Sequence, residues 1–200
     1  MSPDKPELSV PSSPEAFFTE YIPARFSGLP GFERVSSWGS IVFAVPELGV
    51  WAFRLRAGQL LHEAGVPSDS VVRITIPLSS FEPIVVRGTE RMAGLSLAPE
   101  KQLLAFRALT LDGERAAQIR SVVGSVAFAV VDGASKHRVY VTPGSAEPNL
   151  SLPECEISCE SDAFWGLQTG AQNPIELLMS GKIKIAGDAQ IPMALSSLFV

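Results

Sequence analysis

Hydrophobic residues recur along this chain at two spacings, one typical of amphipathic helices and one typical of half-buried strands. Ser13, Pro14 and Glu15 form a helix start, with a capping side chain, a proline in the first turn and an early acid. The apolar stripe of this helix consists of Phe17, Phe18, Tyr21 and Ile22. Residues 71–76 instead alternate between apolar and polar side chains, which predicts a strand of a sheet that is covered on one side.

The same signals divide the rest of the chain into short alternating elements. In the first half we predict strands over residues 40–45, 50–55, 71–76 and 107–111, and helices over residues 78–86 and 99–106. In the second half we predict a helix over residues 114–122, with Ala117 and Ile119 facing inward, and strands over residues 124–130, 138–142 and 155–159. The last forty residues predict two helices, a strand over residues 182–186 and a closing amphipathic segment.

The second half repeats the order of the first. Residues 124–130 match residues 39–45 at an offset of 85, residues 155–159 match 72–76 at 83, and residues 177–178 match 103–104 at 74. Matches in this order are typical of an internal duplication, although any α/β chain supplies a few such strand matches by chance. We predict a disordered lead over residues 1–13, a first copy over 14–113 and a second over 114–200. The halves are expected to pack as one rigid body.

Composition narrows the classes of partner. Hydrophobic residues make up 46% of the chain, which favours a well-filled core, an internal cavity or a buried dimer face, so homo-oligomerisation stays open. The net charge is −5 and the basic residues are scattered, which argues against a nucleic-acid surface. No run of eighteen apolar residues is present and the N-terminus lacks a signal-peptide core, so we expect no stable membrane insertion.

The two cysteines lie in one predicted strand. Cys155 and Cys159 point to the same face about 13 Å apart, too far for a disulfide. They lack a second Cys/His pair at the spacing of zinc ligands. We interpret both as small buried side chains, which fits a reducing cytoplasm.

The end of the chain resembles the type-two sterol carrier family of lipid-binding domains. The resemblance covers about residues 114–200. In that family a helix ends at a glycine, a lysine-bearing strand follows, and a Gly-Asp pair leads into the closing helix. The residues that carry this pattern are Leu178, Met179, Ser180, Gly181, Lys182, Ile183, Lys184, Ile185, Ala186, Gly187 and Asp188. Residues 17–25 also look like the opening helix of bacterial members.

The resemblance implies an α/β (α+β) fold with a mixed or antiparallel sheet covered by helices on one side, here duplicated. It also implies an apolar cavity that binds a fatty-acyl lipid or a sterol- or isoprenoid-like molecule. The residues that match the cavity lining of the family are Phe164, Leu167, Leu177, Leu178, Met179, Ile183, Ile185, Ile191, Met193, Leu195 and Leu198. The same residues could simply close a core, because any amphipathic element gives this pattern.

The first copy departs from the family pattern. Residues 106–110 have no counterpart of the helix-ending Gly181, which puts a pocket in this copy in doubt and suggests that it has become a structural partner. Pro192 lies near the start of the closing segment, where a helix former would be usual.

No residue pattern points to catalysis, a cofactor or a metal. His62 and His137 are the only histidines, and neither a Gly-x-Ser-x-Gly elbow nor a histidine-rich metal motif is present. An enzyme acting on a hydrophobic substrate would need a perturbed carboxylate such as Asp162 or Glu176 facing the cavity. We therefore expect a non-catalytic carrier. The alternatives are a structural or interaction protein with filled cavities and, third, an enzyme.

Overall fold

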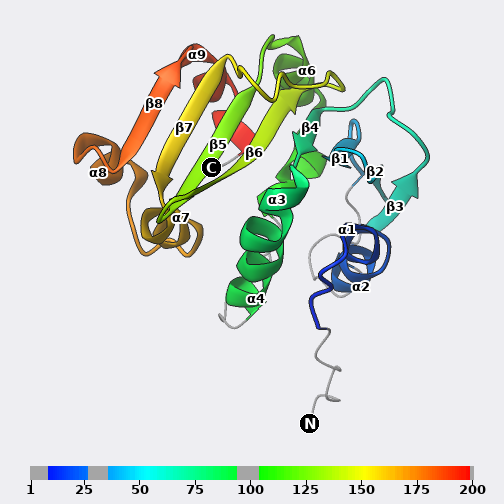
Figure 1. Ribbon diagram of the computed structural model, residues 1–200. Coiled ribbons are helices and arrows are strands. Elements are labelled where there is room, and N and C mark those ends of the chain that lie inside the picture. The colour runs from blue at the N-terminus through cyan, green and yellow to red at the C-terminus, as the bar shows by residue number, and fades with distance from the viewer. Residues whose placement is uncertain (1–8, 27–35, 94–103, 199–200) are drawn as a thin grey trace.

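Strands from both halves of the chain form one continuous sheet. The computed structural model describes residues 9–26, 36–93 and 104–198. Within these residues the sheet has eight strands in the order β3-β2-β1-β4-β6-β5-β7-β8, and each half supplies four neighbouring strands (Figure 1). The expected mixed sheet with helices is therefore confirmed. The two halves share a single sheet and do not form separate ones.

The first half builds its part of the sheet from β1 Ile41–Val45, β2 Gly49–Arg56, β3 Gln59–Glu63 and β4 Val72–Thr75. β1 pairs with β2 antiparallel and with β4 parallel, while β3 continues the hairpin at the outer edge. Alternation predicted three of these strands. β3 was missed because its side chains are mostly exposed and show no clear period.

The second half contains β5 Val126–Asp132, β6 Ser135–Pro143, β7 Cys155–Glu160 and β8 Ile183–Gly187. β5 pairs with β6 antiparallel and with β7 parallel, and β8 closes the other edge against β7. The antiparallel pairing of β4 with β6 joins the halves. All four strands correspond to strands predicted from alternation.

The same hairpin and parallel crossover occur in both halves, in the same register. Ile41 pairs with Val72 across the parallel strands of the first half, and Val126 pairs with Cys155 in the second. These pairs are related by the offsets of 85 and 83 residues that the sequence shows. The matches at offsets of 85 and 83 therefore correspond to equivalent positions in the sheet, whereas the match at 74 relates α8 (Pro174–Met179) to residues at the start of η3 (Leu104–Thr110) and lies outside the sheet.

The helical segments agree with the predictions in part, and the helix predicted over residues 78–86 continues to Ala93. In the first half they are α1 Pro14–Ala16, η1 Phe17–Tyr21, α2 Ile22–Phe26, α3 Leu78–Ser80, η2 Phe81–Val86 and α4 Arg87–Ala93. η3 Leu104–Thr110 ends the first half, and the second half contains α6 Gly113–Ser121, α7 Ser161–Gln168, α8 Pro174–Met179, α9 Gln190–Ala194 and η4 Ser196–Leu198. Ser13 caps the first helix by accepting a hydrogen bond from the Ala16 N–H, as predicted.

Two predictions in the middle of the chain are wrong. Residues 107–111 are not a strand, because residues through Thr110 belong to the 3-10 helix η3. The position beside β4 that such a strand would take is already occupied by β6. In α6 the inward side chain is Ala116, since Ala117 is exposed. Most of the helix predicted over 99–106 lies outside the described residues.

The core is a single cluster on one face of the sheet. Phe17, Phe81, Ile119 and Ile191, from four different helical segments, belong to the same cluster as the strand residue Val126. The helices therefore cover one face, as the resemblance implied. Figure 1 shows α1 and α2 beside the strands of the first half, and α7, α8 and α9 around β7 and β8.

Aromatic rings fill this face in the first half. The Phe18 ring lies 4.9 Å from the Trp51 ring and 5.0 Å from the Phe43 ring, and Phe106 lies 5.2 Å from Phe43 (centroid distances). All of these side chains are buried. A packed aromatic cluster therefore lies between the helices and the sheet in this half.

Candidate functional site

β7 and β8 present a row of apolar side chains to the helix-covered face. Cys155 belongs to the core cluster, and Ile157 packs against it. Because alternate residues of a strand share a face, Cys159 lies on the same side. Ile185 pairs with Ile157, and Ile183 pairs with Cys159. Lys184, which pairs with Ser158, points to the opposite face, as alternation predicted.

Three helices surround this row. α7 contacts β5 and β7, and α8 contacts β8. α9 and η4 contribute Ile191, Leu195 and Leu198 to the core cluster. The predicted lining residues thus all lie on β8 or on the helical segments around it.

Burial divides these predicted lining residues into three groups. Leu177, Ile191, Leu195 and Leu198 are buried. Phe164, Leu167 and Ile183 are half-buried. Leu178, Met179, Ile185 and Met193 are exposed. Part of the set therefore closes the core, and part of it leaves apolar surface in contact with water.

The exposed members concentrate on α8 and β8. Ile185 is 42% exposed and Leu178 is 46% exposed, although Ile185 lies on the face that the core uses elsewhere. Ile175, 70% exposed, belongs with them and was missed by the sequence reasoning. The spacing of Ile175, Leu178 and Met179 at i, i+3 and i+4 would have identified it. We call Ile175, Leu178, Met179 and Ile185 the apolar edge.

Local backbone features fix this arrangement. Asn173 caps α8 by accepting the Ile175 N–H at 2.8 Å, and Gly181, at φ 72°, ends the helix. A left-handed residue after a helix reverses the chain at little cost only when it is glycine. The Lys182 N–H then bonds to the Leu177 carbonyl at 2.9 Å, so α8 leads directly into β8.

Gly187 has a second structural role. Its φ is 91°, and a Cβ at this position would lie 2.2 Å from the Glu154 carbonyl oxygen, so a side chain does not fit. The next residue, Asp188, donates its N–H to the same carbonyl and accepts the Gln190 N–H on its carboxylate. The Gly-Asp pair therefore ends β8 and leads into α9, and the Asp188 carboxylate satisfies a backbone N–H in the first turn of that helix.

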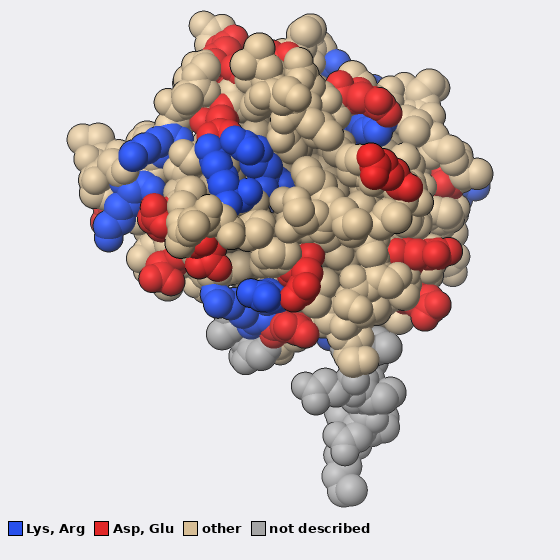
Figure 2. Space-filling model, viewed as in Figure 1, with Lys and Arg blue, Asp and Glu red and all other residues tan. Residues whose placement is uncertain are grey.

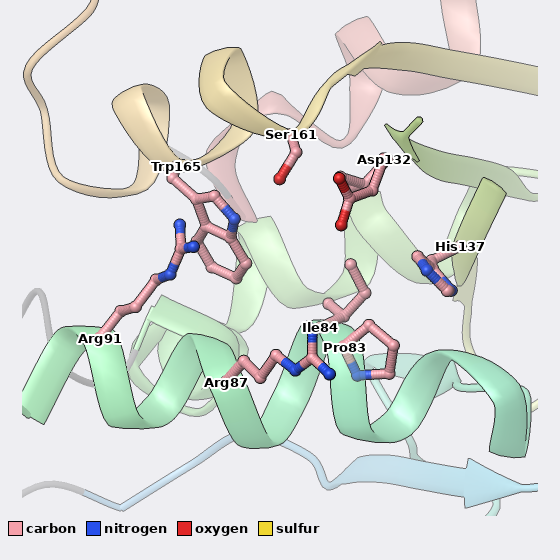
Figure 3. A pocket seen from close by; sticks show the side chains of 9 residues that line it. Pro83, Ile84, Arg87, Arg91, Asp132, His137, Ser161 and Trp165 are labelled. Carbon is pink, nitrogen blue, oxygen red and sulfur yellow. The ribbon is translucent and has the colours of Figure 1, made fainter. Parts of the chain in front are cut away.

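A small polar pocket lies beside α7. Figure 3 shows Trp165 and Ser161 on α7, facing Arg87 and Arg91 of the helical segment α4. The pocket between them has a volume of about 40 Å³. The Arg91 guanidinium stacks over the Trp165 ring at 4.8 Å. This volume holds roughly three water molecules and is far below the roughly 300 Å³ at which small-molecule sites begin. The pocket is therefore too small for an acyl chain.

Titratable groups give little support to a catalytic site. Burial, with a smaller contribution from Glu160, raises the pKa of the Cys159 thiol, and burial with Asp188 raises that of Cys155. Neither shift favours a reactive thiolate. The residues Asp162 and Glu176 are exposed, whereas an enzyme acting on a hydrophobic substrate would need such a carboxylate to face the cavity. Within the part of the chain that the structure describes, no three metal-ligating side chains cluster.

The charge distribution on the surface and the lengths of the helices bear on two other classes of partner, nucleic acids and membranes. Figure 2 shows basic and acidic side chains interspersed over the visible face, without one large basic patch. In residues 9–26, 36–93 and 104–198, every helix is too short or too polar to cross a membrane.

Comparison with known protein families gives a match for the second half of the chain. Residues 103–200 match the model of the SCP-2 sterol transfer family, starting ahead of the boundary predicted at residue 114. No curated protein matches the sequence.

Among solved structures, the chain resembles sterol carrier protein domain 2 of Helicoverpa armigera, at 23% identity and a TM-score of 0.34, over 52% of this chain and 91% of that one. It resembles Sterol Carrier Protein 2 of Yarrowia lipolytica in its apo form, at 23% identity and a TM-score of 0.31, over 40% and 75%. It also resembles palmitated SCP2L2 of Aedes aegypti, at 15% identity and a TM-score of 0.32, over 39% and 73%.

Proposed function

Because residues 103–200 belong to the SCP-2 sterol transfer family, we propose that the second half of this chain binds a hydrophobic molecule without catalysing a reaction on it. Family membership indicates lipid binding or transfer in general. The finer proposal is a fatty-acyl lipid or a sterol- or isoprenoid-like molecule held between β7, β8 and the helices α7, α8 and α9. The observation that supports it is the apolar edge, whose side chains on α8 and β8 stay exposed to water.

Burial of apolar surface supplies the binding energy. Each Å² of apolar surface removed from water contributes about 25 cal/mol. A ligand lying on Ile183 and Ile185 would remove its own surface and that of these side chains from water. Met179 adapts easily to ligands of different shape, since its side chain is unbranched and flexible. Movement of α8 and α9 over the ligand would complete its burial, and the reverse movement would release it.

We propose that residues 14–113 form a second, degenerate copy of the same unit. The repeated hairpin and parallel crossover support this proposal, as does the matching register of Ile41 with Val72 and Val126 with Cys155. In this copy the aromatic cluster around Phe18 takes the place of a ligand. The first half then acts as a structural support, continuing the sheet through β4 and β6.

The absence of catalysis is part of the proposal. The half-buried thiol of Cys159 and the exposed carboxylates of Asp162 and Glu176 do not form an arrangement suited to acid–base or nucleophilic chemistry. The free thiols of Cys155 and Cys159 are compatible with the cytoplasm, a reducing compartment.

The apolar edge also favours one alternative function. Ile175 is 70% exposed and Met179 is 83% exposed, and apolar side chains grouped on one surface are a feature of protein contacts as well as of ligand sites. In that case the edge would mediate dimerisation or partner binding, and no lipid would be retained. The oligomeric state and the ligand content of the purified protein separate the two functions.

Substitutions in the apolar edge test the proposed site. Ile185→Arg and Leu178→Arg each place a charge where the ligand would lie, so displacement of a fluorescent fatty acid by palmitate should become at least about tenfold weaker, since burying an unpaired charge is costly. Val123→Arg is the matched control, because Val123 is 88% exposed on the loop before β5. Unchanged palmitate binding by both folded variants would exclude this site.

A further inference from the structure

A second concave surface lies on the other face of the sheet. Val72 and Ile74 of β4 face the core, so Arg73 and Thr75 point to the opposite side. There they line a groove of about 500 Å³, which is within the range of roughly 300 to 1,000 Å³ that small-molecule sites occupy.

Short side chains in the sheet and long ones around it create this groove. Ala44 and Thr75 form part of the floor, where they pair across β1 and β4. One wall is the turn between β1 and β2, and the other is the segment after β6 that contains Leu150. The Tyr140 hydroxyl donates to the Leu150 carbonyl at 2.7 Å and holds that segment in place.

The walls are apolar and open to water. Leu48 is 54% exposed, Leu150 is 39% exposed and Val50 is 37% exposed, and all three line the groove. These side chains belong to segments far apart in the sequence. They would lie against the apolar body of a bound molecule.

Arg73 is a buried cation with an exposed counter-ion. Only 6% of its surface is exposed. Its Nη2 donates to the Glu147 carboxylate at 2.9 Å, but the Glu147 side chain is 80% exposed. Its remaining contacts are long, at 3.4 Å to the Ser145 carbonyl and 3.4 Å to the Thr75 hydroxyl. One well-formed bond to an exposed side chain satisfies a buried guanidinium poorly, because it can make several.

A buried hydroxyl beside Arg73 is also without a partner. Thr142 pairs directly with Arg73 across β4 and β6, so both side chains lie on the same face. The Thr142 hydroxyl oxygen is buried and makes no hydrogen bond. Unsatisfied buried polar groups are rare in native proteins, so polar hydrogen-bonding capacity is left over beside Arg73.

We propose that this groove binds a small amphipathic carboxylate. The carboxylate pairs with the Arg73 guanidinium, which favours two parallel hydrogen bonds with a planar anion, and displaces Glu147 into solvent. The apolar body lies against Leu48, Val50 and Leu150. This site is separate from the lipid site of the proposed function, because the sheet lies between them.

Calorimetric titration of the full chain with decanoate and with n-decanol tests the proposal. The titration uses the Ile185→Arg background, so that binding at the apolar edge does not contribute. We expect decanoate to bind at one site per chain. Decanol lacks the negative charge and should bind at least about tenfold more weakly.

Two substitutions at the ion pair should act in opposite directions. Arg73→Gln removes the cation and should weaken decanoate binding at least about tenfold. Glu147→Gln removes the competing carboxylate and should tighten it about two- to fivefold, as expected for an exposed ion pair. A structural ion pair alone would not give tighter binding on loss of Glu147.

The proposal is overturned by any of three results: no binding of decanoate, equal binding of decanol, or equal binding after Arg73→Gln. If Arg73→Gln does not fold, Val50→Glu replaces it. This variant puts an anion on the wall of the groove and should weaken decanoate binding more than decanol binding, because only decanoate carries a charge that the new carboxylate repels. Unchanged decanoate binding by folded Val50→Glu would equally contradict the site.

Discussion

At the scale of single residues, Cys159 reports on the proposed lipid site. It lies on the helix-covered face between Val130 and Ile183, with which it pairs on either side. Its side chain is half-buried, whereas Cys155 is completely buried. A ligand on β7 and β8 would cover its sulfur, so the thiol is a chemical probe placed by the fold itself.

Ligand binding should therefore protect Cys159 from alkylation. Burial already raises the pKa of this thiol. A ligand that covers Cys159 would remove more water from the thiol and raise its pKa further. An increase of one pKa unit reduces the population of the reactive thiolate about tenfold. In a Cys155→Ala variant, saturating palmitate should slow iodoacetamide modification by at least about that factor. An alkylation rate that palmitate leaves unchanged would mean that the ligand does not lie on this face.

At the scale of elements, the contact between α4 and α7 joins the two halves. Gly88 of α4 faces Trp165 of α7 so closely that a Cβ at residue 88 would lie 2.9 Å from the indole. Contacts this short force neighbouring groups to move. The glycine is thus required by the partner helix and not by its own backbone, which is an ordinary helical one.

Gly88→Ala should therefore have opposite effects in two backgrounds. In the parent chain it should lower the Tm by several degrees, since overpacking costs typically 1–3 kcal/mol. In a Trp165→Ala background it should raise the Tm, because alanine is favoured over glycine in a helix by about 1 kcal/mol. Thermal unfolding of the four proteins completes the cycle. Stabilisation in both backgrounds would show that the two helices do not press on each other.

The elements that sequence patterns predicted well are those whose structure depends on local residues. Strands β4 and β7 follow from alternation, β1 follows from its β-forming residues, and α1 follows from the cap Ser13. The prediction of a strand over residues 107–111 was wrong because β6, which is distant in the sequence, pairs with the edge of β4 that this strand would need. A pattern of side chains does not reveal which edge is free.

In the proposed lipid site, too, the features that depend on local residues were predictable and those that depend on distant contacts were not. The family motif located α8, Gly181, β8 and Gly187, and the glycines have the positive φ that the turns require. The burial of individual lining residues could not be predicted, since it depends on how far α8 and α9 cover the sheet. The groove around Arg73 was missed altogether, because its walls come from segments about a hundred residues apart, near residues 48 and 150.

At the scale of the whole molecule, one sheet carries two halves that differ in how they are covered. The aromatic cluster around Phe18 packs on the first half, while the side chains of the apolar edge stay exposed in the second half. The pairing of β4 with β6 makes the sheet continuous between the halves. The central proposal is that the second half holds a hydrophobic ligand.

Native mass spectrometry of the freshly purified chain, followed by organic extraction, tests this claim most directly. We expect a monomer carrying a bound mass of a few hundred daltons, about the size of a fatty acid or an isoprenoid, which the extract then identifies. The Leu178→Arg variant should lose this mass. A ligand-free mass that persists after incubation with fatty acids and isoprenoids would contradict the account, and a dimer in that spectrum would assign the apolar edge to protein contacts.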